Sequence, residues 1–300
     1  MRGVYLMISM VSMLSLGCSE MSQERIEIPL SVEGVDLSSP IRARDDVDVT
    51  LERAQLAFGP LYLCAGSTAG DLCETARLEW LGSAVIDLGS PEPREVGLLK
   101  GVTGEVRSWM YDLGISSQLT RSDPFTLDAA RELDGASISL EGYAEVDGIS
   151  VPFMISLEAS QTDDTELGVP LVRKSSSDRF MHDVTRDDRR LTVRFDARAW
   201  VQRLNFRPYV RRDECTDELN ATMSATVDGR TVICDGTTEL TCEDQQTYTT
   251  RDCSALEQVC LPGVGCADRL EIESDSELYR ALRNTLVSGE RPTFRWSQSP

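Results

Sequence analysis

The sequence predicts an all-β protein: an antiparallel β-sandwich of Ig-like architecture with a few short helices and an inserted disulfide-rich module. Three observations predict this class. Apolar and polar residues alternate with period two along much of the chain, and Gly, Pro and Asp separate these short runs. In addition, six cysteines crowd into residues 215–266. Many short, punctuated strands are typical of sandwiches rather than of helical or α/β proteins.

The first strands are expected where apolar residues recur at every second position. Residues 26–32 and 47–51 each present one apolar face. Around Arg53 the phase slips by one residue, and the apolar positions continue over 54–58 on even numbers. Such a slip predicts a β-bulge or a strand that switches sheets. The pattern resumes at 61–63, after a Gly-Pro pair.

Two Asp-Gly pairs predict β-hairpins. Asp147-Gly148 separates the apolar residues of 138–140 from the alternating run 149–157. A type I′ turn needs positive φ at both central residues, which this dipeptide tolerates well. Asp228-Gly229 repeats the same pattern inside the cysteine-rich segment, and 191–195 adds a further strand.

Helical signals are few. Asp196 can cap a short helix that reaches Leu204, and residues 127–133 can form one or two turns. Near the end of the chain, Ser274 and Glu277 form a capping box, and leucines follow at helical spacing.

The terminal helix should stop at Gly289, and residues 292–296 should then form a last strand. The apolar face of this helix needs a partner larger than the cysteine-rich segment can supply. We therefore expect the chain to return to the sandwich after the last cysteine. On this reading the domain order is a signal peptide (1–17), a polar tether (18–25), the sandwich (26–210), the cysteine-rich module (211–267), and a helix with a terminal strand (268–300).

The cysteines are expected to form disulfides. Nine are present, and setting one aside for the N-terminal segment leaves an even number suited to an oxidising compartment. The pairing is open, since six cysteines in one module allow 15 connectivities. A zinc site is disfavoured because no C-x-x-C spacing occurs there and the one histidine, His182, lies outside this segment. No cofactor is expected. The disulfide candidates are Cys64, Cys73, Cys215, Cys234, Cys242, Cys253, Cys260 and Cys266.

The remaining cysteine, Cys18, closes a short apolar segment that carries a single cation, Arg2. The run 14–18, Leu-Ser-Leu-Gly-Cys, resembles the lipobox of bacterial lipoproteins, in which a signal peptidase cuts before the cysteine and the new N-terminus is acylated. The resemblance implies lipid attachment at Cys18, and more than one acyl chain gives stable membrane anchoring. It also implies the outer rather than the inner membrane, because Ser19 and not Asp follows the cysteine. The alternative is an ordinary secretory signal.

Short strings elsewhere resemble secreted lipoproteins of Gram-negative bacteria, among them Gly59-Pro60-Leu61-Tyr62-Leu63 and the closing Phe294-Arg295-Trp296. Cys234-Asp235-Gly236-Thr237 and Cys260-Leu261-Pro262-Gly263 are similar to parts of small EGF-like modules. These resemblances imply a secreted β-rich body with a disulfide-rich insertion, and they transfer no catalytic residue.

The charge of the chain disfavours several partners. The formal net charge is −20, and an acidic field of this size repels nucleic-acid phosphates and anionic lipid surfaces. We therefore expect no nucleic-acid partner, and membrane association only through the N-terminal lipid. Possible partners are an envelope protein or an envelope polysaccharide.

Catalytic motifs are absent from the sequence. His182 is the one histidine, so any Ser-His or Cys-His mechanism would depend on it, and no G-x-S-x-G, P-loop or dinucleotide motif occurs. His182 is expected in a loop, and Asp187-Asp188 with their neighbouring arginines in a self-neutralised surface turn. Met181 and His182 supply fewer ligands than a copper site needs.

Acidic residues offer a weak calcium site. Asp163, Asp164 and Glu166 lie close together, and calcium prefers several carboxylate and carbonyl oxygens. The favoured alternative is a solvated acidic loop, because the D-x-D-x-D-G ligand spacing is missing.

Aromatic residues have two possible roles. Trp109, Tyr111 and Trp200 could line a carbohydrate or peptide groove, but in a sandwich they are expected to pack in the core.

The sequence thus predicts a lipid-anchored envelope protein with a non-catalytic binding, adhesion or scaffold role. Two alternatives stay open. The first is a hydrolase of an envelope polymer that uses paired carboxylates, since their proximity is spatial and not visible in sequence. The second is a calcium-dependent binding protein.

Overall fold

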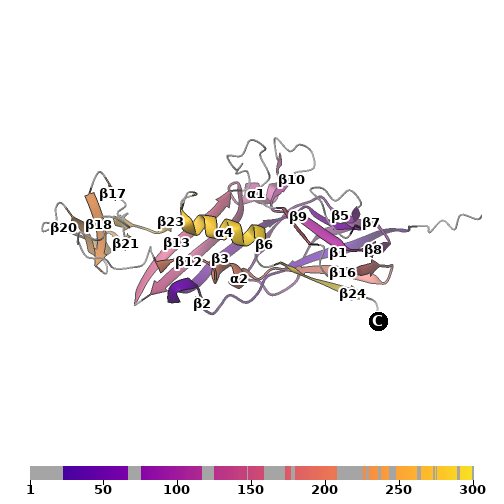
Figure 1. Ribbon diagram of the computed structural model, residues 1–300, viewed down its shortest axis with the longest axis horizontal. Helices are drawn as coiled ribbons and strands as arrows, with labels where there is room; N and C mark the ends of the chain where they lie inside the picture. The colour runs from indigo at the N-terminus through magenta and orange to yellow at the C-terminus, as the bar shows by residue number, and fades with distance from the viewer. Residues whose placement is uncertain are drawn as a thin grey trace, which may run out of the picture.

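In the computed structural model of the protein, an elongated two-sheet body carries the cysteine-rich strands at one end (Figure 1). The structure describes residues 23–66, 76–116, 125–146, 148–158, 173–176, 180–207, 226–227, 230–235, 238–242, 248–261, 265–272, 274, 276–288 and 291–298.

The first sheet has eight strands in the order β14-β9-β4-β5-β7-β1-β16-β24. Its pairs are antiparallel except for β1 with β16, which run parallel. The bounds are β1 Arg25–Glu33, β4 Leu61–Cys64, β5 Ala76–Trp80, β7 Arg94–Val102, β9 Ser108–Asp112, β14 Arg173–Ser176, β16 Asp188–Arg194 and β24 Thr293–Gln298.

The second sheet has the order β2-β3-β12-β13-β23, and β6 pairs with β3 beside this path. Its bounds are β2 Ile41–Arg42, β3 Asp48–Phe58, β6 Ala84–Asp87, β12 Ala136–Val146, β13 Ile149–Glu158 and β23 Leu270–Glu271. Two small two-stranded pairs flank the sheets: β10 (Ile115–Ser116) with β11 (Phe125–Thr126), and β8 (Gly104–Val106) with β15 (His182–Val184). A 3₁₀ turn, η1, covers Arg44–Asp46.

One continuous core joins the inner faces of both sheets. The alternation at 26–32 contributes to it directly, since Ile28, Leu30 and Val32 are buried in it. The other face of β1 is covered as well towards its end, where Ser31 and Glu33 are buried. Phe58 lies at the centre of an aromatic cluster, with ring centroids 5.3 Å from Phe195 and 5.6 Å from Tyr111. The all-β sandwich-like class predicted from the sequence is confirmed.

The phase slip at Arg53 is a β-bulge. Glu141 of β12 pairs with Arg53, but the next residue, Gly142, pairs with Leu51, so Glu52 has no partner in the ladder. Glu52 and Arg53 are both exposed although they are consecutive. The bulge therefore places two neighbouring side chains on the outer face of the sheet, which a regular strand could not do.

The Asp147-Gly148 hairpin is also confirmed. Val146 pairs with Ile149, so two residues join β12 to β13, and Gly148 has φ +78°. The long ladder that follows makes this hairpin the centre of the second sheet.

Three α-helices are described: α1 (Asp128–Glu132), α2 (Ala197–Val201) and α4 (Glu277–Ser288). Asp196 caps α2 as expected, because its carboxylate accepts a hydrogen bond from the Arg198 amide. None of the helices in the described part of the chain has the length and apolar character of a bilayer-spanning segment.

The cap of α4 differs from the expected one. The Tyr279 amide donates to Ser276 Oγ at 3.1 Å, so Ser276 rather than Ser274 is the N-terminal cap. The helix packs beside α2 and across β13, and it buries Leu278, Leu282 and Leu286 in the common core (Figure 1). Gly289, its expected stop, lies outside the described residues.

The cysteine-rich segment contains a four-stranded sheet and a short hairpin. The chain then runs through β23 and α4 to β24, which pairs with β16 in the first sheet. The bounds are β17 Thr226–Val227, β18 Arg230–Asp235, β19 Thr238–Cys242, β20 Tyr248–Asp252, η3 Ser254–Leu256, β21 Val259–Leu261 and β22 Gly265–Ala267.

Candidate functional site

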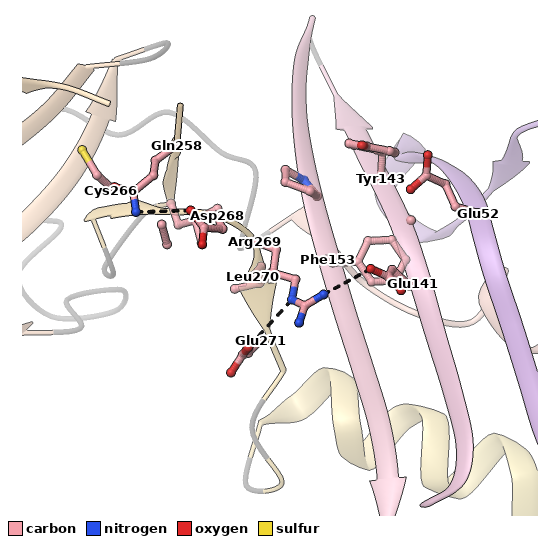
Figure 2. A pocket seen from close by; sticks show the side chains of 14 residues that line it. Glu52, Glu141, Tyr143, Phe153, Gln258, Cys266, Asp268, Arg269, Leu270 and Glu271 are labelled. Atoms are coloured by element: carbon pink, nitrogen blue, oxygen red, sulfur yellow. Dashed lines mark hydrogen bonds and ion pairs between the residues drawn. The ribbon is translucent and has the colours of Figure 1, made fainter. Parts of the chain in front are cut away.

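A groove lies where the cysteine-rich segment joins the second sheet, and it encloses a cavity of about 810 Å³ (Figure 2). Strands β3, β12 and β13 supply one wall, and residues 258–271 supply the other. The lining residues are Glu52, Glu141, Gly142, Tyr143, Pro152, Phe153, Gln258, Leu261, Cys266, Ala267, Asp268, Arg269, Leu270 and Glu271.

Two carboxylates lie near the bulge, Glu52 on β3 and Glu141 on β12, and they differ in how they are paired. Arg53, one of the bulged residues, pairs with Glu141, with 2.6 Å between Nη2 and Oε2. Glu52, the other bulged residue, has no hydrogen bond or ion pair with any residue that the structure describes. One carboxylate is thus neutralised, and the other faces the groove with its full charge.

Arg269 connects the two walls. Its Nη1 donates to Glu141 Oε1 at 3.1 Å, and its Nε lies 3.8 Å from Glu271 Oε1 (Figure 2). In the described part of the chain, β23 pairs with β13 over Leu270 and Glu271. The ion pair between Arg269 and Glu141 therefore adds a second attachment between the cysteine-rich segment and the second sheet.

Tyr143 is the exposed aromatic residue of the groove, with 40% of its surface accessible. In the ladder it lies between Thr50 of β3 and Pro152 of β13, so a tyrosine and a proline form a platform on the outer face. Tyrosine is enriched in binding surfaces because it combines apolar area with a polar tip.

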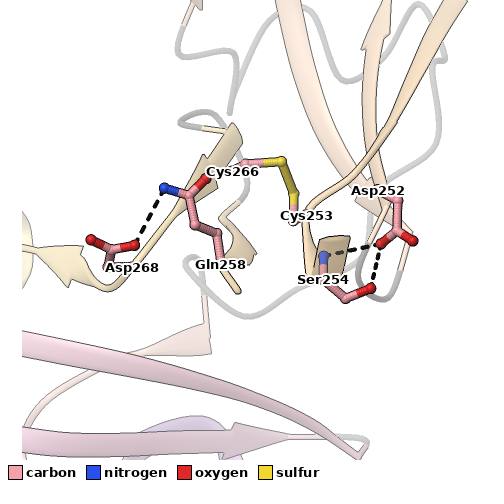
Figure 3. Close-up of a disulfide and its surroundings, with 6 residues drawn as sticks. All are labelled: Asp252, Cys253, Ser254, Gln258, Cys266 and Asp268. Carbon is pink, nitrogen blue, oxygen red and sulfur yellow. Dashed lines mark hydrogen bonds between the residues drawn. A yellow bond between two sulfur atoms is a disulfide. The ribbon is translucent and has the colours of Figure 1, made fainter. Parts of the chain in front are cut away.

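A disulfide supports the opposite wall. Cys253 and Cys266 are joined with an S–S distance of 2.09 Å (Figure 3). Gln258, within the loop that this bond closes, donates from Nε2 to Oδ1 of Asp268, two residues beyond the loop, at 3.3 Å. Asp252 accepts from the Ser254 hydroxyl and amide, and these hydrogen bonds lower the pKa of its carboxyl. The wall formed by residues 258–271 is therefore held in place by a disulfide and a side-chain hydrogen bond.

The groove is acidic. Four carboxylates line it, those of Glu52, Glu141, Asp268 and Glu271, against the single guanidinium of Arg269. Glu141 is a poor candidate for proton transfer, because both of its oxygens already interact with guanidinium groups. The arrangement is suited to binding positive charge.

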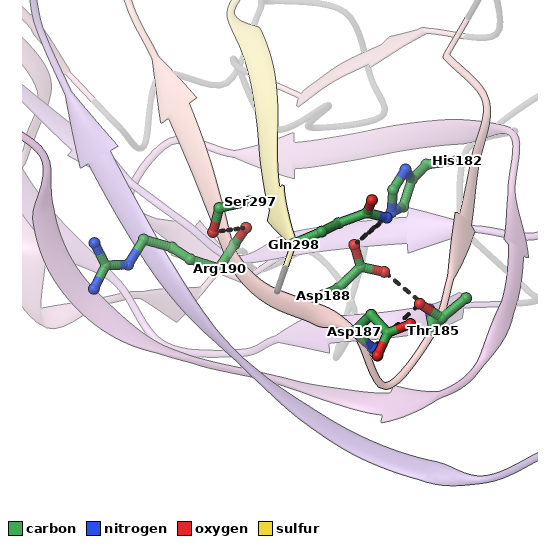
Figure 4. A network of polar contacts seen from close by, with 7 residues as sticks. All are labelled: His182, Thr185, Asp187, Asp188, Arg190, Ser297 and Gln298. Atoms are coloured by element: carbon green, nitrogen blue, oxygen red, sulfur yellow. Dashed lines mark hydrogen bonds and ion pairs between the residues drawn. The ribbon is translucent and has the colours of Figure 1, made fainter. Parts of the chain in front are cut away.

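A second polar cluster surrounds His182 and corrects two expectations (Figure 4). His182 lies in strand β15 rather than in a loop, and Asp188 is buried rather than part of a surface turn. Asp188 Oδ1 is 3.0 Å from His182 Nε2 and 3.3 Å from Gln298 Nε2, while Oδ2 accepts from the Thr185 amide at 2.9 Å. The alternation pattern missed this residue because its burial depends on Gln298, 110 residues away.

The His182 ring also stacks on Trp296, with centroids 4.1 Å apart and planes 9° from parallel. The side chain of His182 is 18% exposed and that of Asp188 is fully buried. Among the described residues, the polar contact of His182 is with the Asp188 carboxylate, and no hydroxyl or thiol is hydrogen-bonded to its ring. The cluster ties β15, β16 and β24 together.

The expected disulfides are described in part. Cys253 pairs with Cys266, and Cys64 and Cys260 are each disulfide-bonded too. Cys234 and Cys242 lie on β18 and β19. Cys18, Cys73 and Cys215 lie outside the described residues.

The calcium candidates Asp163, Asp164 and Glu166 also lie outside the described residues. Within the described part of the chain, no three His, Cys, Asp or Glu side chains are grouped closely enough to hold a metal ion.

The aromatic residues pack as expected in the core. Trp109, Tyr111 and Trp200 are each at most 4% exposed, and Trp109 stacks on Tyr111 at 5.4 Å. Burial raises the pKa of the Tyr111 phenol above its usual range. These residues therefore do not line the groove, whose aromatic rings are the exposed Tyr143 and the buried Phe153.

No family model matches the chain, and no curated protein matches it. Among solved structures, MbnP from Methylosinus trichosporium is similar, with a TM-score of 0.33 and 11% identity, over 61% of this chain and 79% of that chain. A likeness this distant carries no argument about function.

Proposed function

We propose that this protein is a lipid-anchored component of the bacterial cell envelope, attached through Cys18, with a non-catalytic binding role centred on the groove at Tyr143. The outer membrane is the expected location, since Ser19 follows the lipobox-like run. The groove is the observation that carries the binding role, because it combines a cavity of about 810 Å³ with an exposed aromatic platform.

The disulfides support export. The bond between Cys253 and Cys266, together with the bonded states of Cys64 and Cys260, is typical of oxidising compartments such as the periplasm. A stapled wall also suits a binding role, because a rigid site loses less conformational entropy when a partner binds.

The anchoring is tested by intact mass spectrometry of the full protein expressed in a Gram-negative host. We expect a mature chain that begins at Cys18 and carries diacylglycerol and an acyl chain, in the outer-membrane fraction. A Cys18→Ser variant should lack this mass and leave that fraction. A wild-type product that keeps residues 1–17, or that is soluble with reduced thiols, contradicts the proposal.

The non-catalytic role is tested with peptidoglycan as substrate. We expect no soluble fragments beyond those released by a Glu52→Gln, Asp268→Asn double variant. If the wild type releases fragments and the double variant does not, the protein is a hydrolase and its carboxylates act in catalysis.

A further inference from the structure

Glu52 and Tyr143 form a pair suited to a cation. Thr50 is the residue opposite Tyr143 in the ladder, and Glu52 follows it two residues along β3. Both side chains line the groove and lie at the same end of it (Figure 2). A carboxylate beside an aromatic face attracts guanidinium or ammonium groups by charge and by the ring quadrupole together.

The bulge is what makes Glu52 available. A regular ladder would direct Glu52 and Arg53 to opposite faces, whereas here both are exposed. Arg53 is engaged by Glu141, with 2.6 Å between Nη2 and Oε2. The charge of Glu52 is therefore left for a partner, because none of the described residues neutralises it.

The rest of the groove has the same sign. Asp268 is exposed, the side chain of Glu271 is 70% exposed, and the lining carries three more negative than positive groups. The whole chain has a net charge of −20, so a basic partner gains long-range attraction as well. A neutral oligosaccharide would gain nothing from this charge.

We propose that the groove binds a basic segment of a partner protein, with one arginine or lysine side chain held between the Tyr143 ring and the Glu52 carboxylate. This inference rests on the proposed binding role and specifies its ligand. Asp268 and Glu271 then face the neighbouring basic residues of the same segment.

The test uses the full mature protein in detergent and a fluorescent hexa-arginine peptide as the probe. A hexa-citrulline peptide is the matched control, because citrulline has the shape of arginine without its charge. We expect the arginine peptide to bind at least about tenfold more tightly, and its affinity to fall as salt is raised.

Three variants localise the binding. Glu52→Gln and Tyr143→Leu should each weaken the arginine peptide by about two- to fivefold, the range expected for one exposed ion or cation–π pair. Glu95→Gln removes the same charge from an exposed position on β7 of the other sheet and should leave the affinity unchanged. Thermal melting confirms that each variant is folded.

Two results overturn the inference: equal binding of the two peptides, or equal effects of Glu52→Gln and Glu95→Gln. Binding of a peptidoglycan tetrasaccharide that Tyr143→Leu abolishes, without binding of the peptide, assigns the groove to carbohydrate instead. These failures leave the Cys18 anchor intact, whereas loss of lipidation with retained peptide binding removes only the proposed location.

Discussion

Arg269, the residue before β23, donates to Glu141 of β12, with 3.1 Å between Nη1 and Oε1, across 128 residues of sequence. Arg53 approaches the other carboxylate oxygen of Glu141 from β3. A single acidic residue thus connects the bulge on one strand to the segment that leaves the cysteine-rich strands.

Glu141→Gln should loosen this connection. The two ion pairs are partly exposed, so we expect a loss of about 1 kcal/mol in the free energy of unfolding. The local effect should be larger, with faster hydrogen exchange at the amides of β23. Glu145→Gln, an exposed position on the same face, is the control. Equal exchange in β23 for both variants would show that the ion pairs do not hold the wall.

Asp188→Asn should destabilise the sandwich. Its carboxylate accepts from Thr185 and Gln298 and lies against His182, and an amide nitrogen cannot accept those hydrogen bonds. We expect a cost of about 1–3 kcal/mol and a melting temperature several degrees lower. Asp187→Asn removes the same charge next to it at an exposed position. If both variants melt alike, the cluster contributes no stability.

The strands were predictable because their signal is local. Alternation at 26–32 and the Asp147-Gly148 turn depend on neighbours in sequence, and both appear as expected. The slip at Arg53 was visible for the same reason. The sequence did not indicate that this slip places Glu52 beside Tyr143, because their proximity depends on the register between β3 and β12.

Non-local contacts explain the remaining errors. Asp188 was expected in a surface turn because arginines surround it in sequence, but Gln298 and His182 enclose it in space. Arg269 gave no local signal at all, since its partner Glu141 belongs to a distant strand. The predicted cap of α4 was Ser274 and the observed cap is Ser276, because two serines near the helix start satisfy similar sequence patterns.

Gly142→Ala should disrupt the bulge. A Cβ at this position would lie 2.0 Å from the Thr50 carbonyl oxygen, so the backbone of β3 or β12 must move. Overpacking of this kind costs about 1–3 kcal/mol. Because Gly142 lies between Glu141 and Tyr143, we also expect weaker binding of the arginine peptide. Gly148→Ala is the control for space, since nothing lies within 4 Å of its Cβ position, although its positive φ adds some strain. Unchanged stability of Gly142→Ala contradicts the close contact.

Replacing Cys253 and Cys266 together by serine should loosen the wall of the groove that residues 258–271 form. The bond closes a loop with a sequence separation of 13, and loops of about this length are stabilised by about 3 kcal/mol. We expect faster proteolysis within residues 251–272, while hydrogen exchange in β1 and β16 stays unchanged. Equal cleavage of the wild type and the variant would mean that the ion pairs of Arg269 suffice to hold the wall.

Asp196→Asn should reveal a pH-dependent contribution to stability. The side-chain hydrogen bond from Arg198 lowers the pKa of Asp196, although burial opposes this shift. A lowered folded-state pKa stabilises the fold above the unfolded pKa, near 4, and this contribution is lost as the pH falls through the folded value. Asparagine keeps the cap but loses the ion pair, so the variant should be less stable at pH 7 by about 0.5 kcal/mol after screening by solvent. The difference in the free energy of unfolding should shrink below pH 4 in denaturant titrations.

Asp128→Asn, at a side chain that is 94% exposed, is the control and should show a smaller difference at every pH. A gap between wild type and Asp196→Asn that widens on acidification would reverse the sign of the proposed linkage.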